Sequence, residues 1–310
     1  MTPQLPPCSG RYAVLGVPTS AGAHHAGQDR APAALRAHGF VTRLRELGVD
    51  VCDDGDVVGE TFRADAEHPT ARNLEAVVRV ARRVADAVAA CRAEDRVPIL
   101  LGGDCTITLG AVAGVQRRHP DAGLLYLDGD ADLARPGHGT GILDATGVAH
   151  LLGLADSPLA RLGPATPMLT PERLVLLGYD TTDAETFHAP TLAALPGLVH
   201  VPDAELRADP AAVARRAVTA ITRHASAVVV HFDVDAVDSG DLPLANFPHY
   251  GTGVPLTAAA TVLAECVAVP GLAAVVLTEV NPGHDPAGDH LRRYVAAVTS
   301  ALAAALAGRD

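Results

Sequence analysis

The sequence predicts an α/β fold, a three-layer α/β/α sandwich around a mostly parallel sheet of about eight strands. Short aliphatic runs alternate along the chain with longer segments of helical periodicity. Several of these runs are apolar throughout, as strands are when helices cover both faces of the sheet. No repeat, linker or break in composition divides the 310 residues, so we expect a single domain over residues 1–310.

The expected strands are runs rich in Val, Leu and Ala that end at Gly, Pro or Asp. In chain order they are Tyr12–Val17, Val49–Cys52, Val97–Leu101, Gly123–Leu127, Leu174–Gly178, Leu198–Val201, Ala227–Phe232 and Ala273–Thr278.

The expected helices are segments with apolar residues at three- and four-residue intervals, mostly placed between strands as crossovers. They are Pro32–Leu47, Ala71–Arg92, Thr106–Arg118, Pro210–His224, Leu256–Val267 and Asp289–Ala307.

Composition excludes several classes of function. The net charge of −12 argues against a nucleic-acid partner and against an anionic membrane surface, since both draw their affinity from clustered Lys and Arg. The chain contains no lysine, so all 24 of its basic side chains are Arg. A Schiff base, a pyridoxal-phosphate anchor and a Walker-type phosphate loop all need a Lys amine, and all three are excluded.

Cysteine usage and the N-terminus predict a cytoplasmic protein. The five cysteines are odd in number and widely scattered, a pattern typical of a reducing compartment rather than of a disulfide framework. The first residues lack a basic region followed by an apolar stretch, and no run approaches the length of a membrane span.

Acidic residues follow the carboxyl ends of several expected strands. In a parallel sheet, the loops at these ends bind ligands. Two groups of three carboxylates, within Asp128–Asp132 and Asp233–Asp238, come directly after apolar runs. One isolated run of this kind would be read as a turn or a helix cap. Carboxylates from two such runs would repel one another on one edge of a sheet unless divalent cations bound there. The pair therefore favours a metal site with one or two ions.

These segments resemble the three metal-binding motifs of the ureohydrolase (arginase/agmatinase) family. The matching stretches are Gly102–Cys105, Asp128–Asp132 and Phe232–Asp238, and their order and spacing also match. Glu279–Pro282 is similar to the family's glutamate motif near the C-terminus. The resemblance covers nearly the whole chain and implies an arginase-like fold.

The resemblance also implies a binuclear site and its residues. Cys105, Asp128, Asp132 and Asp233 would hold one ion, and Asp128, Asp130, Asp233 and Asp235 the other. In the family, water activated by the two ions attacks a guanidinium carbon. A residue at the position of Glu279 holds the cationic substrate, and a His at or near His138 carries protons. Both are expected to be substrate-binding and catalytic residues, and Asp132 is expected to be catalytic.

Two departures from the family pattern bear on the metal. The family usually has His where Cys105 and Asp130 stand. The resemblance therefore implies two divalent ions, Mn²⁺ in first place, with Zn²⁺ as the alternative because thiolate favours softer metals. Cys105 also has two other readings, a small buried residue at a helix start or a reactive thiol.

A third departure concerns the substrate. Arginases carry an Asn two residues beyond the position of Asp132, and here that residue is Ala134. The loop Gly137–Gly141 is closer to the His-Gly-Thr of agmatinase-like members. We therefore expect a guanidino or amidino compound other than L-arginine as the substrate.

The expected function is metal-dependent hydrolysis of a C–N bond in a small guanidino or amidino molecule, that is, in a linear amidine. One alternative is a non-catalytic, metal-deficient homologue that acts as a binding protein. Another is a metalloenzyme of the same fold with different amide or imine chemistry. The resemblance further implies a homo-oligomer, a trimer or a hexamer.

Four histidines near the motifs are given lesser roles. His24 and His25 are read as an exposed loop pair, with a substrate contact as the alternative. His231, inside an expected strand, is read as a hydrogen-bonded core residue rather than a ligand, and His249 as a residue at the entrance of the site.

Overall fold

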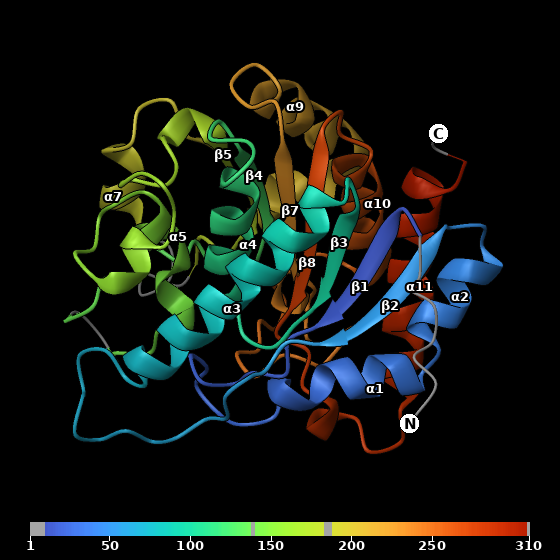
Figure 1. Cartoon of the computed structure of the whole chain (residues 1–310), viewed down its shortest axis with the longest axis horizontal. Helices are drawn as coiled ribbons and strands as arrows, with labels where there is room; N and C mark the ends of the chain where they lie inside the picture. The colour runs from blue at the N-terminus through green and yellow to red at the C-terminus, as the bar shows by residue number, and fades with distance from the viewer. Residues whose placement is uncertain (1–9, 138–139, 183–187, 309–310) are drawn as a thin grey trace.

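The computed structural model describes residues 10–137, 140–182 and 188–308. Its centre is an eight-stranded sheet in the order β2-β1-β3-β8-β7-β4-β5-β6 (Figure 1). Every pair of neighbouring strands is parallel, which confirms the predicted sheet. The strands are β1 (Tyr12–Gly16), β2 (Val51–Asp56), β3 (Val97–Leu101), β4 (Gly123–Leu127), β5 (Leu174–Tyr179), β6 (Val199–Pro202), β7 (Val228–Asp233) and β8 (Leu272–Thr278).

Helices cover both faces of the sheet and complete the three layers (Figure 1). One face packs against α1 (Ala31–Ala37), α2 (Phe40–Glu46), α9 (Pro210–Ile221), α10 (Leu256–Val267) and α11 (Asp289–Leu306). The other face packs against α3 (Leu74–Ala93), α4 (Ile107–Gln116) and α5 (Gly147–Leu151). Two further short helices are α7 (Ala189–Ala193) and α8 (Asp203–Ala208).

Successive strand residues alternate between the two cores, which explains why the strands are apolar throughout. Along β4, Leu124 and Tyr126 belong to the core beneath α3 and α4. Leu125 and Leu127 belong to the core beneath α9, α10 and α11. Because both faces are covered, neither set of side chains can be polar, and the half-polar alternation of a one-sided sheet is missing.

The first predicted helix is wrong in one respect. The segment Pro32–Leu47 is not continuous, because Gly39 adopts a φ of +83° between α1 and α2. This left-handed conformation ends a helix, and glycine adopts it without the steric cost that a Cβ would impose. Helical periodicity continues across the break because both helices bury their apolar sides against the same core.

The described cysteines are mostly free, and one takes part in a disulfide bond. Cys91, Cys105 and Cys266 are free thiols, whereas Cys52 on β2 is disulfide-bonded.

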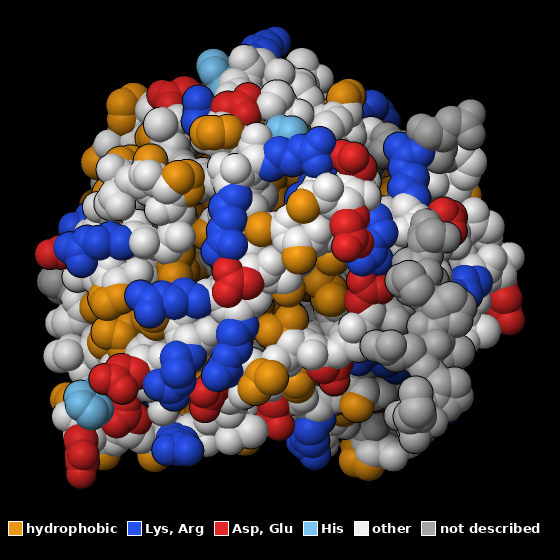
Figure 2. Space-filling model, viewed as in Figure 1, with side chains coloured by type: hydrophobic (Ala, Val, Ile, Leu, Met, Phe, Trp, Pro, Cys, Tyr) orange, Lys and Arg blue, Asp and Glu red, His pale blue; other side chains and the backbone are white. Residues whose placement is uncertain are grey.

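On the face seen in Figure 2, Arg side chains lie among Asp and Glu side chains rather than in a separate patch. Arg79 and Arg83 on α3 both pair with Glu60, and Arg117 pairs with Asp86. None of the described helices is long and apolar enough to cross a membrane.

Candidate metal centre

Four neighbouring strands, β3, β8, β7 and β4, carry the acidic motifs at their carboxyl ends. The chain leaves β3 toward Cys105, β8 toward Glu279, β7 at Asp233 and β4 at Asp128. A small cavity of about 30 Å³ lies between them. Its lining is His24, Cys105, Asp128, Asp130, Asp132, Asp144, Ala145, Asp233, Asp235, Asn246, Phe247 and Glu279.

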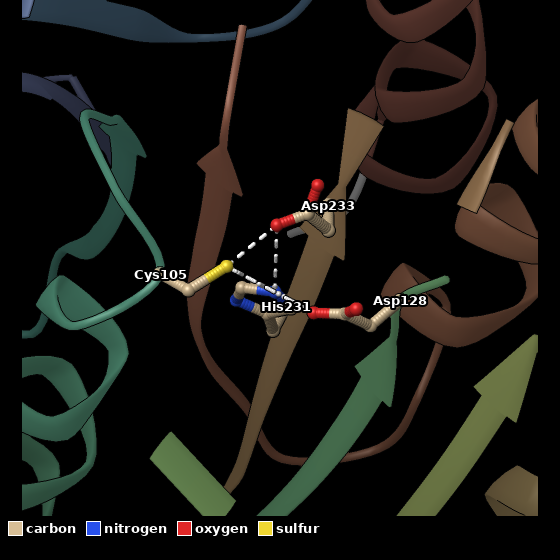
Figure 3. A group of neighbouring side chains, drawn as sticks. All are labelled: Cys105, Asp128, His231 and Asp233. Atoms are coloured by element: carbon tan, nitrogen blue, oxygen red, sulfur yellow. Dashed lines mark hydrogen bonds and ion pairs between the residues drawn. The ribbon is translucent and has the colours of Figure 1, made fainter. Parts of the chain in front are cut away.

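The first cluster consists of Cys105, Asp128, His231 and Asp233, whose side chains converge from the β3–α4 loop, β4 and β7 (Figure 3). The Cys105 thiol donates to Asp233 Oδ2 at 2.5 Å and lies 3.8 Å from both Asp128 Oδ2 and His231 Nε2. His231 Nε2 lies 3.4 Å from Asp128 Oδ2. All four residues are buried, so these polar atoms face one another rather than solvent.

His231 is held rigidly within this first cluster. Its ring stacks on Tyr126 with 4.0 Å between centroids, and its Nδ1 lies 2.7 Å from the Thr108 hydroxyl on α4. Complete burial lowers the pKa of His231 to about 3, so the imidazole is neutral. The expectation that His231 is a hydrogen-bonded buried residue is met, but its Nε2 points at the cluster.

The second cluster consists of Asp130, Asp235 and His249. His249 Nε2 is buried, has no hydrogen-bond partner among the described residues and lies 3.5 Å from Asp130 Oδ1. On its other side, His249 Nδ1 lies 3.7 Å from Asp180 Oδ2. Burial alone would lower the pKa of His249, but the carboxylates of Asp235 and Asp130 outweigh it and raise that pKa. Because His249 is only 5% exposed, it is not the entrance residue that the sequence suggested.

Backbone N–H groups orient the carboxylates of both clusters. Asp130 N–H donates to Asp128 Oδ1 at 2.7 Å, and Asp235 N–H donates to Asp233 Oδ1 at 2.8 Å. Each D-x-D motif thus ties one oxygen of its first Asp to its own loop. The other oxygen, Oδ2, is the one that faces Cys105.

Asp132 and Glu279 flank the clusters and share an unusual backbone. Their φ values are +51° and +64°, in the left-handed region that non-glycine residues seldom occupy. The Tyr126 hydroxyl donates to Asp132 Oδ2 at 2.5 Å. Glu279 accepts from Cys105 N–H at 2.9 Å through Oε1 and from Gln28 Nε2 at 2.7 Å through Oε2.

Crowding of carboxylates perturbs nearly every acid at the site. Burial, followed by repulsion from Asp130, raises the pKa of Asp128 to about 7. Burial and the nearby Asp128 likewise raise the pKa of Asp235 to about 7. For Asp132, Asp233 and Glu279, burial and neighbouring acids raise the pKa well above its ordinary value.

The residues present fit divalent metal ions. In each cluster the ligand atoms lie within 4.8 Å of one another, and the donors are thiol, imidazole and carboxylate, all common metal ligands. Two features of the site are costly: an imidazole nitrogen of His249 that is buried without a hydrogen-bond partner in the described chain, and several buried acids with raised pKa values. A cation would remove both costs at once.

The structure thus brings together six of the predicted metal-site residues and Glu279 around one cavity. His138 lies outside the described residues. His24 lines the cavity instead of lying fully exposed, whereas His25 is exposed. The sequence did not point to Asp144, which is 7% exposed and lines the cavity. Within the part of the chain that the structure describes, its Oδ1 has no hydrogen-bond partner. Its only signal was its place shortly after the second motif.

A larger cavity of about 920 Å³ adjoins the metal cavity and shares His24, Asp130, Ala145 and Phe247 with it. Leu133, Ile142 and Leu143 give it an apolar wall, and Arg135 and His188 also line it. Ala134 belongs to the same lining. The small cavity thus has an adjoining space that can hold a substrate.

Comparison with known proteins places this architecture in a family. The sequence model of the arginase family matches residues 10–309. The chain belongs to the arginase family. An arginase from Bacillus caldovelox is 29% identical over 306 residues, which cover 95% of this chain and 97% of that protein.

Solved structures of arginase-family proteins agree. An arginase from Bacillus cereus has 26% identity and a TM-score of 0.79, with 96% of this chain and 99% of that chain covered. A formiminoglutamase from Trypanosoma cruzi, crystallised with Mn²⁺, has 18% identity and a TM-score of 0.73, with 97% and 95% covered. The latter likeness shows the fold alone. Together they confirm the predicted arginase-like fold, and membership of the family supports a hydrolase.

Proposed function

We propose that the protein is a metal-dependent hydrolase that cleaves a C–N bond in a small guanidino or amidino substrate, other than L-arginine. The observation that carries the proposal is the convergence of acidic motifs from four adjacent strands on one cavity with two clusters of metal-ligand type. When bound there, divalent ions would supply a nucleophile by lowering the pKa of water.

The chain's own residues would bind and orient the substrate cation. Glu279 is 7% exposed and fixed by two hydrogen bonds. Asp144 lines the same cavity, and its Oδ1 has no hydrogen-bond partner in the described ranges. Guanidinium and amidinium groups are planar cations that carboxylates bind through charge-assisted hydrogen bonds. Two buried carboxylates at the cavity therefore favour a cationic group over a neutral amide.

One residue of the adjoining cavity favours a substrate other than L-arginine. The lining combines apolar Leu133, Ile142 and Leu143 with polar side chains that include Arg135 and His188. Ala134 stands among them where the resemblance places an Asn in arginases, so the α-amino acid head group of L-arginine would lack that polar partner.

The test is a hydrolysis screen with protein loaded with Mn²⁺, Zn²⁺ or both. L-arginine, agmatine, guanidino acids and formimino compounds would be offered, and released urea or ammonia measured. We expect turnover of at least one compound other than L-arginine, and its loss in Asp235→Asn but not in Asp86→Asn, an exposed residue on α3. Metal-loaded protein that hydrolyses none of these compounds would favour a non-catalytic homologue instead.

A further inference from the structure

Positions 105 and 130 lack the imidazoles that the family resemblance implies, yet two other histidines point into the same clusters. His231 comes from inside β7 and His249 from the loop after it. We propose that the chain binds its two metal ions through a rearranged ligand set, in which His231 joins Cys105 and His249 joins Asp130. This proposal rests on the metal requirement of the proposed function and names the ligands that would meet it.

The first cluster has the dimensions of a tetrahedral site. Four ligands at about 2.0–2.3 Å from an ion lie roughly 3.3–3.8 Å apart. The distances of 3.4 Å from His231 Nε2 to Asp128 and of 3.8 Å from Cys105 Sγ to Asp128 and to His231 match this spacing. His231 Nε2 lies 4.0 Å from Asp233 Oδ2.

One distance in the first cluster is too short for a shared ion. Cys105 Sγ carries the thiol proton, donates to Asp233 Oδ2 and lies 2.5 Å from it. Replacing that proton with an ion would separate the two atoms by about 1 Å, within the reach of a side-chain rotation. The proton would leave with solvent, since a thiol ligates metal as the thiolate.

His231 has the second partner that metal-bound histidines commonly show. Such a histidine usually donates its other ring N–H to an oxygen, which fixes the tautomer and the direction of the ligating nitrogen. Thr108 Oγ1 lies 2.7 Å from His231 Nδ1 and can accept that N–H. The lone pair is then on Nε2, which faces Cys105 and Asp128.

His249 is built into the second cluster by a neighbouring glycine. Gly129 lies between Asp128 and Asp130, and a Cβ there would come within 2.8 Å of His249 Cδ2 and 2.9 Å of Nε2. Only glycine leaves room for this ring. Asp180 lies on the far side of the ring near Nδ1, so that Nε2 is directed at Asp130.

The two donor sets differ in softness, so the two ions should differ. Thiolate and imidazole in the first cluster favour Zn²⁺ or Co²⁺, while the second cluster, with two carboxylates and one imidazole, also suits Mn²⁺. A centre with one zinc-type ion and one harder ion follows from these side chains alone.

The experiment is a Co²⁺ titration of metal-free full-length protein followed by absorption spectroscopy, because a thiolate–Co²⁺ bond gives a charge-transfer band. Wild type should bind two Co²⁺ per chain and show that band. Cys105→Ser should lose the band. His231→Gln should lower the affinity for the Co²⁺ ion that gives the band by about tenfold or more. His249→Gln should lose one ion and keep the band.

Two further variants test whether a loss of metal comes from the missing ligand or from misfolding. His150→Gln removes another buried histidine, on α5 and outside both clusters, and should keep both ions and the band. Gly129→Ala keeps His249 but crowds both its ring and the backbone oxygen of Asp235, and should also lose one ion. When metal-free protein is given equal concentrations of Zn²⁺ and Mn²⁺, the wild type should retain one Zn²⁺ per chain. Cys105→Ser should lose that Zn²⁺.

The proposal is overturned if His231→Gln and His249→Gln both bind two Co²⁺ with wild-type affinity, or if the band survives in Cys105→Ser. If two ions bind and the Cys105, His231 and His249 variants change that binding as described, the ligand set is supported even when no guanidino compound is hydrolysed. In that case the proposed function fails and the metal assignment stands.

Discussion

The carboxylate of Glu279 is oriented on two sides, by the backbone N–H of Cys105 and by the side-chain amide of Gln28. Both partners donate to it, so the carboxylate is fixed before any substrate arrives. A positive φ at Glu279 places it toward the cavity at some conformational cost. Such preorganisation is typical of a residue that binds substrate.

Replacing this charge should weaken substrate binding without removing metal. Glu279→Gln keeps the size of the side chain and loses the charge-assisted hydrogen bond, worth about 1.5–3 kcal/mol. We expect kcat/KM to fall roughly 10–100-fold on the substrate found in the screen, with metal content unchanged by elemental analysis. Glu67→Gln, an exposed glutamate, serves as the control. Unchanged kcat/KM would show that Glu279 does not hold the cation.

Several residues of the site could be predicted from the sequence because they lie in short motifs directly after strands. Cys105, Asp128 and Asp233 are of this kind, and all three line the cavity. His249 could not be found this way, since it lies in a loop with no strand directly before it and meets Asp180, 69 residues away, only in the folded chain. Asp144 was missed for the same reason.

At the scale of elements, α4 carries the loop with Cys105 and must lie close to the sheet. Its Gly110 and Gly114 face α3, where a Cβ on Gly110 would come within 2.4 Å of the Ala81 carbonyl oxygen. The backbones of the two helices can approach each other closely because these glycines have no side chains. Sequence periodicity predicted both helices, but nothing in the sequence revealed how near they approach.

The variant Gly110→Ala tests this close contact. Alanine would raise helix propensity by about 1 kcal/mol, but overpacking against backbone costs about 1–3 kcal/mol. We expect a net loss of unfolding free energy in urea or thermal denaturation. Ser300→Ala, at an exposed position of α11, should change stability by less than about 0.5 kcal/mol. Stabilisation by Gly110→Ala would mean that α3 and α4 are packed more loosely.

The element boundaries that the sequence missed have local causes. The break at Gly39 is invisible to periodicity because α1 and α2 bury the same side of the chain. The strand β2 extends to Asp56 although Asp53, Asp54 and Asp56 are polar, since it lies at the edge of the sheet. There, Arg36 donates to Asp53 and to Asp56, which offsets their charge.

For the whole molecule, the buried acids make stability depend on pH and on metal together. A carboxyl group whose pKa is higher in the folded chain binds more protons when folded, so unfolding free energy falls as pH rises between its two pKa values. For Asp128 and Asp235 this window runs from 3.8 to about 7. The metal-free protein should therefore lose stability as pH rises through this range.

Thermal denaturation tests this expectation. Metal-free protein should melt at a lower temperature near pH 8 than near pH 6, and added divalent metal should remove most of that difference. The double variant Asp128→Asn, Asp235→Asn should show a smaller pH dependence. A melting temperature that rises with pH in the metal-free wild type would contradict the proposed crowding of uncompensated acids.

Elemental analysis of full-length protein purified without chelator tests whether the site binds metal. We predict close to two divalent ions per chain in the wild type. We predict a value below one in the double variant Asp128→Asn, Asp233→Asn, which removes a charge from both D-x-D motifs. A wild-type value near zero that added Mn²⁺, Zn²⁺ or Co²⁺ cannot raise would contradict a metal-dependent hydrolase.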